Sequence, residues 1–134
     1  MNAIDPIEFV GDAAVTTRSG RNTEILTVVD DDARNMTLAA ADILAGINVH
    51  TSVTGGGTVT VDTAANIIAG VPLEKDNECI TSYYINDGDQ TATFAVASGT
   101  TIADVGNTVL TNEAAVLIWR RTSATAVKLY IVSS

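Results

Sequence analysis

The feature that most constrains this fold is a series of short apolar runs, each of which ends at turn-forming residues before it becomes long. Runs such as 25–29, 58–62 and 126–132 are rich in Val, Ile and Thr, which suit a pleated sheet. No helical pattern between them reaches the roughly 10–15 residues that separate the strands of a parallel α/β sheet. We therefore predict an all-β fold: an antiparallel β-sandwich of jelly-roll type, with about eight short strands and one or two short helical turns.

The clearest local pattern lies in residues 47–62. Ile47 and Val49 alternate with Asn48 and His50, which is the period of a half-buried strand. A run of three glycines follows, and after it a second alternating stretch. This pattern predicts a β-hairpin with a flexible glycine turn, in which His50 occupies the polar-side register of its strand.

Two further strand pairs are predicted in the second half of the chain. The turn at 86–89 (Asn-Asp-Gly-Asp) returns the run 78–85 into the run 91–96. Close to the C-terminal end, the runs 114–121 and 126–132 pair across a short polar turn.

The two helical turns are expected in the connections between strands. Thr37 caps a short helical turn that Gly46 ends, and Asp62 or Thr63 caps a second turn that Gly70 ends. Neither turn is long enough to form a layer of its own.

Residues 1–23 show no sustained periodicity and cannot form a core by themselves. We predict that they form an extended N-terminal arm that becomes ordered on a neighbouring molecule, with a disordered tail as the alternative. Residues 24–134 then form a single β-sandwich domain. The apolar residues of the arm, which we expect at a partner interface, are Ile4, Ile7, Phe9 and Val10.

The charge balance excludes some partners. With 16 acidic and 7 basic residues the formal net charge is −9, whereas phosphate neutralisation needs clustered Lys and Arg. We therefore expect no nucleic-acid partner. No stretch approaches the roughly 18 apolar residues of a membrane span, so no membrane partner is expected either. The first residues lack a basic segment and a long apolar core, which predicts synthesis in the cytoplasm without a secretory signal.

The residues that usually carry chemistry are few and scattered. His50 is the only histidine and Cys79 the only cysteine, so neither a zinc site nor a disulfide within the chain is expected. The acidic turns at 30–32 and 86–89 offer oxygen ligands for calcium, but solvated turns explain them better. We expect no catalytic residue, no metal site and no cofactor, and we predict that the protein is not an enzyme.

Trp119, Arg120 and Arg121 form a distinctive group in so acidic a chain. Trp and Arg are enriched at the centres of protein interfaces, which makes these residues candidates for a partner contact. The alternative is that Trp119 lies on one face of a sheet while the arginines bind nearby carboxylates. The sequence leaves both interpretations open.

The sequence also resembles a group of small β proteins that decorate the capsids of tailed bacteriophages and related viruses. The resemblance lies in the segments HTSVTGGGTVTVDTAANIIAGV, TSYYINDGDQTATFAVASGT and WRRTSATAVKLYIVSS. It implies a jelly-roll-like cement protein that forms a homotrimer, binds between major capsid protein subunits and stabilises the shell. The expected location is the capsid surface of the virion, and the family contributes no catalytic residues.

Two other functions remain open. One is a receptor- or glycan-binding head of a phage tail fibre or spike, although a fibre needs a long shaft for which 134 residues leave no room. The other is a small hydrolase or lectin-like protein on a jelly-roll scaffold, which would need a histidine and carboxylate cluster that this sequence does not contain. Fold alone does not decide among these functions.

Overall fold

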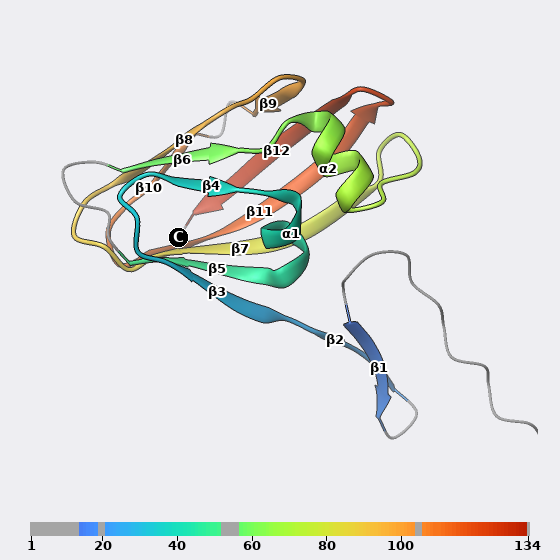
Figure 1. Cartoon of the computed structure of the whole chain (residues 1–134), viewed down its shortest axis with the longest axis horizontal. Coiled ribbons are helices and arrows are strands. Elements are labelled where there is room, and N and C mark those ends of the chain that lie inside the picture. Colours follow the sequence, from blue (N-terminus) through green and yellow to red (C-terminus); the bar gives the residue numbers. More distant parts are fainter. Residues whose placement is uncertain (1–13, 19–20, 52–56, 104–105, 134) are drawn as a thin grey trace, which may run out of the picture.

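The computed structural model describes residues 14–18, 21–51, 57–103 and 106–133. In this part of the chain a six-stranded and a four-stranded sheet pack face to face, as Figure 1 shows. In order across the six-stranded sheet, the strands are β3 (Thr27–Asp31), β5 (Gly46–His50), β7 (Cys79–Asn86), β11 (Glu113–Ser123), β12 (Ala126–Ser133) and β9 (Thr100–Ile102). Those of the four-stranded sheet are β10 (Thr108–Val109), β8 (Ala92–Ala95), β6 (Thr58–Val61) and β4 (Met36–Leu38).

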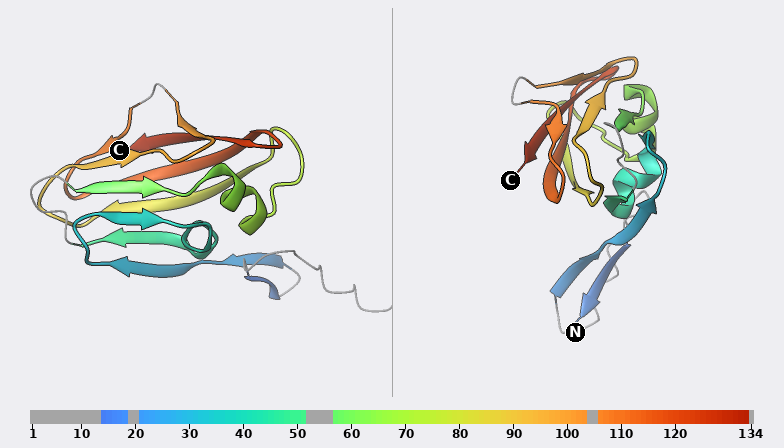
Figure 2. Two further views of the ribbon diagram at one scale, coloured as in Figure 1. Left: turned by 45° about the horizontal axis from the view of Figure 1, so that its top comes forward. Right: turned by 90° about the vertical axis from the view of Figure 1, so that its left-hand side faces the viewer.

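The hydrophobic core lies between the two sheets. Its largest side chains are those of Trp119 and Tyr84 from the six-stranded sheet and Phe94 from the four-stranded sheet, all 2% exposed or less. Two short helices, α1 (Ala40–Ala45) and α2 (Ala64–Gly70), also contribute buried side chains to this core. In the right-hand view of Figure 2 both helices lie on one side of the molecule and the C-terminal strand on the other. The six-stranded sheet therefore has an inner face toward the core and an outer face away from it.

The prediction of a mostly β fold with two short helices is confirmed, but the sheets are mixed rather than antiparallel. Five strand pairs are parallel: β3–β5, β5–β7, β4–β6, β6–β8 and β9–β12. From β3 to β8 the chain alternates between the two sheets, and the successive strands of each sheet in this part run in the same direction. The described residues also form more strands than the eight or so predicted.

The hairpin predicted in residues 47–62 is wrong. Strand β5 pairs with β3 and β7 in the six-stranded sheet, whereas β6 pairs with β4 and β8 in the four-stranded sheet. The glycine-containing connection thus links the two sheets. The turn at 86–89 does the same, because it joins β7 to β8 in the opposite sheet. Only the last predicted pair is confirmed, since β11 and β12 form an antiparallel hairpin.

The helix signals were partly correct. Thr63 is the N-cap of α2, where its hydroxyl accepts a hydrogen bond from the Asn66 amide at 3.2 Å. Helix α1 does not use the predicted cap, because Thr37 lies in β4 and Ala39 is the N-cap residue. Gly46 follows α1 with φ of +103°, a conformation that glycine adopts without strain.

At the N-terminal end of the described residues, β1 (Ala14–Arg18) and β2 (Arg21–Ile25) form an antiparallel sheet of their own. Figures 1 and 2 show this hairpin projecting from the sandwich at the start of β3. The predicted boundary between the arm (1–23) and the domain (24–134) lies within β2, so the last part of the predicted arm belongs to this hairpin. Because residues 1–13 lie outside the described residues, an arm that binds a neighbour stays a prediction.

Candidate functional site

The outer face of the six-stranded sheet carries a row of apolar side chains across five neighbouring strands. The row follows from the register: Val28 pairs with Ile47, Ile47 with Tyr83, Tyr83 with Val116 and Val116 with Val132. Residues at paired positions point to the same side of a sheet. Three of these residues are exposed, with Val28 at 55%, Val132 at 54% and Tyr83 at 39%.

Neighbouring rows extend the apolar surface and place charges at its ends. On one side of the central row lie Val49 and Ile85, with Asp30 at the β3 edge. On the other side lie Ile118 and Tyr130. A last row contains Cys79, Arg120, Lys128 and Thr101. The outer face is thus apolar at its centre, acidic at one corner and basic near the diagonally opposite one.

The inner face of β5 and β7 is unexpectedly polar. Asn48 and His50 were predicted on the polar side of their strand, with Ile47 and Val49 toward the core. The structure reverses this arrangement: Asn48 and His50 are fully buried and the two apolar residues lie on the outer face. The alternating pattern identified the strand correctly but not which of its faces meets the core.

Hydrogen bonds explain how these polar groups are accommodated. The ring nitrogens of His50 lie 2.7 Å from the Tyr84 hydroxyl and 2.7 Å from the Ala33 carbonyl oxygen. The Asn48 amide donates to the Asp42 carbonyl at 3.0 Å, while its Oδ1 is buried without a partner among the described residues. Burial raises the pKa of the Tyr84 phenol, because the charged form would lose its hydration.

Asn86, the last residue of β7, is a further buried polar residue whose side chain is hydrogen-bonded. Its amide nitrogen donates to the carbonyl oxygens of Gln90 and Val109, and its Oδ1 accepts from the Gly88 amide. These bonds fix the turn that carries the chain into the opposite sheet. Asn86 thus stabilises the fold.

Trp119 lies on the inner face, where it is fully buried. Its indole N–H donates to the Ser82 hydroxyl at 2.9 Å. This placement agrees with the structural alternative weighed for Trp119 and leaves it no exposed surface with which to contact a partner.

The arginines hold the loop that precedes β7. Arg121 donates to the Leu73 carbonyl at 2.9 Å and lies 3.3 Å from the Asp76 carboxylate. Arg120 donates through two nitrogens to the Asn77 side-chain oxygen and through a third to the Tyr130 hydroxyl. Both contacts are structural, but Arg120 also belongs to the outer face, so its interface role stays a prediction.

In the same loop the Glu78 carboxylate accepts hydrogen bonds from the backbone amides of Lys75 and Glu74, at 2.9 and 2.7 Å. These bonds lower the pKa of Glu78, the one from Lys75 most strongly. The side chain of Cys79 is exposed at the start of β7.

The remaining candidates offer little chemistry. In the part of the chain that the structure describes, no group of three or more His, Cys, Asp or Glu side chains could hold a metal ion. No described helix has the length and apolar content to cross a lipid bilayer. The arm residues Ile4, Ile7, Phe9 and Val10 lie outside the described residues.

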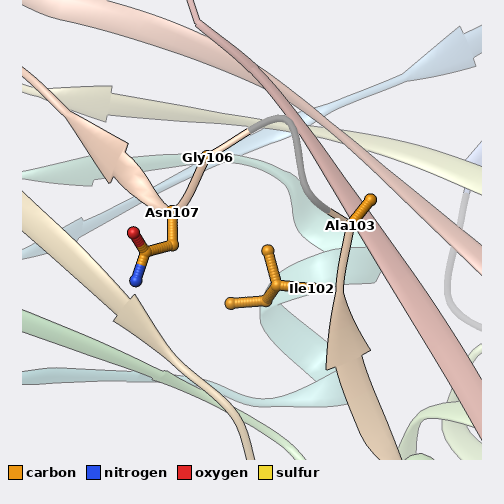
Figure 3. Close-up of a pocket in the computed structure, with 4 residues that line it drawn as sticks. All are labelled: Ile102, Ala103, Gly106 and Asn107. Carbon is orange, nitrogen blue, oxygen red and sulfur yellow. The ribbon is translucent and has the colours of Figure 1, made fainter.

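A small open hollow of about 320 Å³ lies beside β9, with Ile102, Ala103, Gly106 and Asn107 around it. In Figure 3 the side chain of Ile102 points toward Asn107, whereas the side chain of Ala103 points away from both residues. These four residues supply one amide and no titratable group, so we assign no chemistry to the hollow.

Comparisons with protein-family models, with curated proteins and with solved structures found no match to this chain. The outer face of the six-stranded sheet, with its row of exposed apolar side chains, is the candidate site on which a functional argument can be based.

Proposed function

We propose that this protein is a structural component of a virion, a capsid decoration protein that assembles with other protein subunits and stabilises the shell. One observation carries the proposal: a broad apolar sheet face that no described part of the chain covers. The sequence resemblance to capsid cement proteins is the reason for proposing that this assembly is a virion. The jelly-roll connectivity, the self-association of the chain and the contact with the major capsid protein belong to the same proposal.

The outer face supports an assembly function because contiguous exposed apolar surfaces mark sites of protein contact. Val28, Tyr83 and Val132 belong to one row rather than being scattered singly, and isolated exposed apolar residues would need no explanation. The aromatic rings of Tyr83 and Tyr130 on this face are of a type enriched at interfaces.

Attachment to the shell is assigned to the N-terminal residues. Burying Ile4, Ile7, Phe9 and Val10 would contribute about 1.5–3 kcal/mol each. Ordering about ten residues costs roughly 1–2 kcal/mol per residue in backbone entropy. Apolar contacts alone therefore do not order this segment, and we propose that it adds as a strand to a sheet of the capsid protein, where backbone hydrogen bonds supply the remainder.

Co-sedimentation with undecorated capsids tests this function. We expect the full chain to bind such particles saturably and to raise the temperature at which the shells break. Deletion of residues 1–10 should weaken attachment at least about tenfold, while circular dichroism of the sandwich is unchanged. Leu110→Ser, at an exposed apolar residue outside the arm (53% exposed), is the matched control and should bind normally. A full chain that does not bind would refute the proposed function.

A further inference from the structure

We propose that the outer face of the six-stranded sheet pairs with the same face of a second copy of this chain, in a two-fold symmetric dimer with crossed strands. This dimer deepens the assembly function proposed above, on which it rests, by naming the partner, and it takes the place of the homotrimer that the sequence resemblance implies. Each copy would contribute the row that contains Val28, Tyr83 and Val132.

The size of the outer face fits such a dimer. Six strands spaced about 4.8 Å apart give a width of roughly 24 Å. Strands β7 and β12 have 8 residues each, which at about 3.3 Å per residue is a length of roughly 26 Å. Each copy would thus cover about 600 Å² of the other, and the total of about 1,200 Å² lies at the lower end of specific protein interfaces.

The orientation of the side chains shows why this face should be covered. Strands β3, β5 and β7 are parallel to one another, and parallel strands are usually covered on both faces. In β5 the polar Asn48 and His50 point inward while Ile47 and Val49 point outward. If the outer face met water, a shift of the β5 register by one residue would be favourable, because it would move Ile47 and Val49 from water into the core. A partner on the outer face removes this advantage, because it buries the two residues in the native register.

The charges make the face complementary to itself. Asp30 lies at the β3 edge in one end row, and Lys128 lies near the opposite edge in the other end row. A two-fold axis in the plane of contact, along the other diagonal, places each Asp30 over the partner copy's Lys128. The same operation turns the strands by about 90°, which is one of the two preferred ways in which sheets pack. Because β7 and β12 are about as long as the sheet is wide, the central parts of the two faces overlap in this orientation.

This arrangement favours a second copy over a strongly charged partner. A basic partner would meet Arg120 and Lys128, and an acidic one would meet Asp30. Two copies of a chain with a net charge of −9 repel each other overall. The opposed corners replace part of that repulsion by attraction, and they also fix the orientation of the dimer.

Sedimentation velocity of the full chain at micromolar concentrations tests the dimer. We expect a dimer for the native chain, and for Tyr83→Lys a dissociation constant at least about tenfold higher, because the two-fold axis places each substituted residue in the interface twice. Val132→Lys should act in the same way at the end of the row. Val96→Lys is the matched control, since Val96 is also exposed (49%) but lies outside the outer face.

Charge reversal tests the orientation. Asp30→Lys and Lys128→Asp should each weaken the dimer, and the double variant should restore most of the native affinity. Circular dichroism confirms that every variant is folded. If Tyr83→Lys does not fold, Val132→Lys and the charge pair give the same information.

The dimer is overturned by a native chain that is monomeric or trimeric, or by equal effects of Tyr83→Lys and Val96→Lys. Double charge reversal without recovery overturns the crossed orientation. These outcomes are distinct from failure of the proposed function, because the two experiments measure different properties. Co-sedimentation measures attachment to capsids, whereas sedimentation velocity measures the oligomeric state of the free protein. A monomeric native chain that still binds capsids overturns the dimer alone.

Discussion

Removing one member of the buried His50–Tyr84 pair should destabilise the protein almost as much as removing both. The Ala33 carbonyl can only accept, so His50 Nε2 donates to it, and in the neutral ring Nδ1 accepts from the Tyr84 hydroxyl. Both residues are fully buried, and no water can replace a lost partner at their contact.

The magnitude follows from this burial. Tyr84→Phe leaves the His50 Nδ1 acceptor unsatisfied, and His50→Leu leaves the Tyr84 hydroxyl unsatisfied; each change should cost about 1–3 kcal/mol. Ala33 is exposed, so its carbonyl can be hydrated and adds little to the cost. Tyr84→Phe also keeps the ring that packs edge-on against Phe94, at 5.0 Å between centroids. The double variant carries no orphaned polar group from the pair and should cost less than the sum of the singles by about 0.5–3 kcal/mol.

Urea unfolding near neutral pH measures these costs. Trp119 is the only tryptophan and is fully buried, so its fluorescence reports exposure of the core, while circular dichroism reports the sheets. All four proteins must be compared at one concentration, because self-association shifts the apparent stability. Strictly additive costs, or a Tyr84→Phe variant as stable as the native chain, would show that the hydrogen bond does not stabilise the fold.

Two further changes should have effects that the structure defines. Burial raises the pKa of the Tyr84 phenol. The stability linked to this group is therefore complete below about pH 10, the pKa of an unfolded tyrosine, and is lost as the pH rises further. The phenolate absorbance of Tyr84 should appear only when circular dichroism shows unfolding, and ionisation of Tyr84 in the folded protein would contradict this expectation. Gly99→Ala should lower the free energy of unfolding by about 1–3 kcal/mol, because the backbone at this position has a φ of +79°. The loss should be larger still because the new Cβ would lie 2.8 Å from the Thr125 carbonyl oxygen and from the Ala64 side chain. Gly106→Ala, at φ of +116° with open space around it, is the control in thermal unfolding, and equal losses would exclude the contact.

The sequence by itself determined the features that arise from interactions between near neighbours. The hairpin of β11 and β12 follows from two apolar runs joined by a short polar turn. The start of α2 follows from the hydroxyl of Thr63, which needs only an amide three residues away. Strand positions were also recognisable, because alternation with a period of two is a property of the strand itself.

The tertiary structure decided which strands pair and which face of each strand meets the core. The connections after β5 and β7 have the composition of hairpin turns, yet both cross to the other sheet, because pairing partners are selected by contacts between distant parts of the chain. Trp119 could be assigned to an interface or to a sheet face from sequence, and only packing placed it in the core.

The same limit applies to the candidate site. Alternation between Ile47, Asn48, Val49 and His50 is unchanged if the two faces are exchanged, so the pattern cannot say which residues are buried. The structure buries Asn48 and His50 because Asp42, Ala33 and Tyr84 provide their hydrogen-bond partners. The apolar residues are thereby placed on the outer face, and the interaction surface exists only once the strands have assembled.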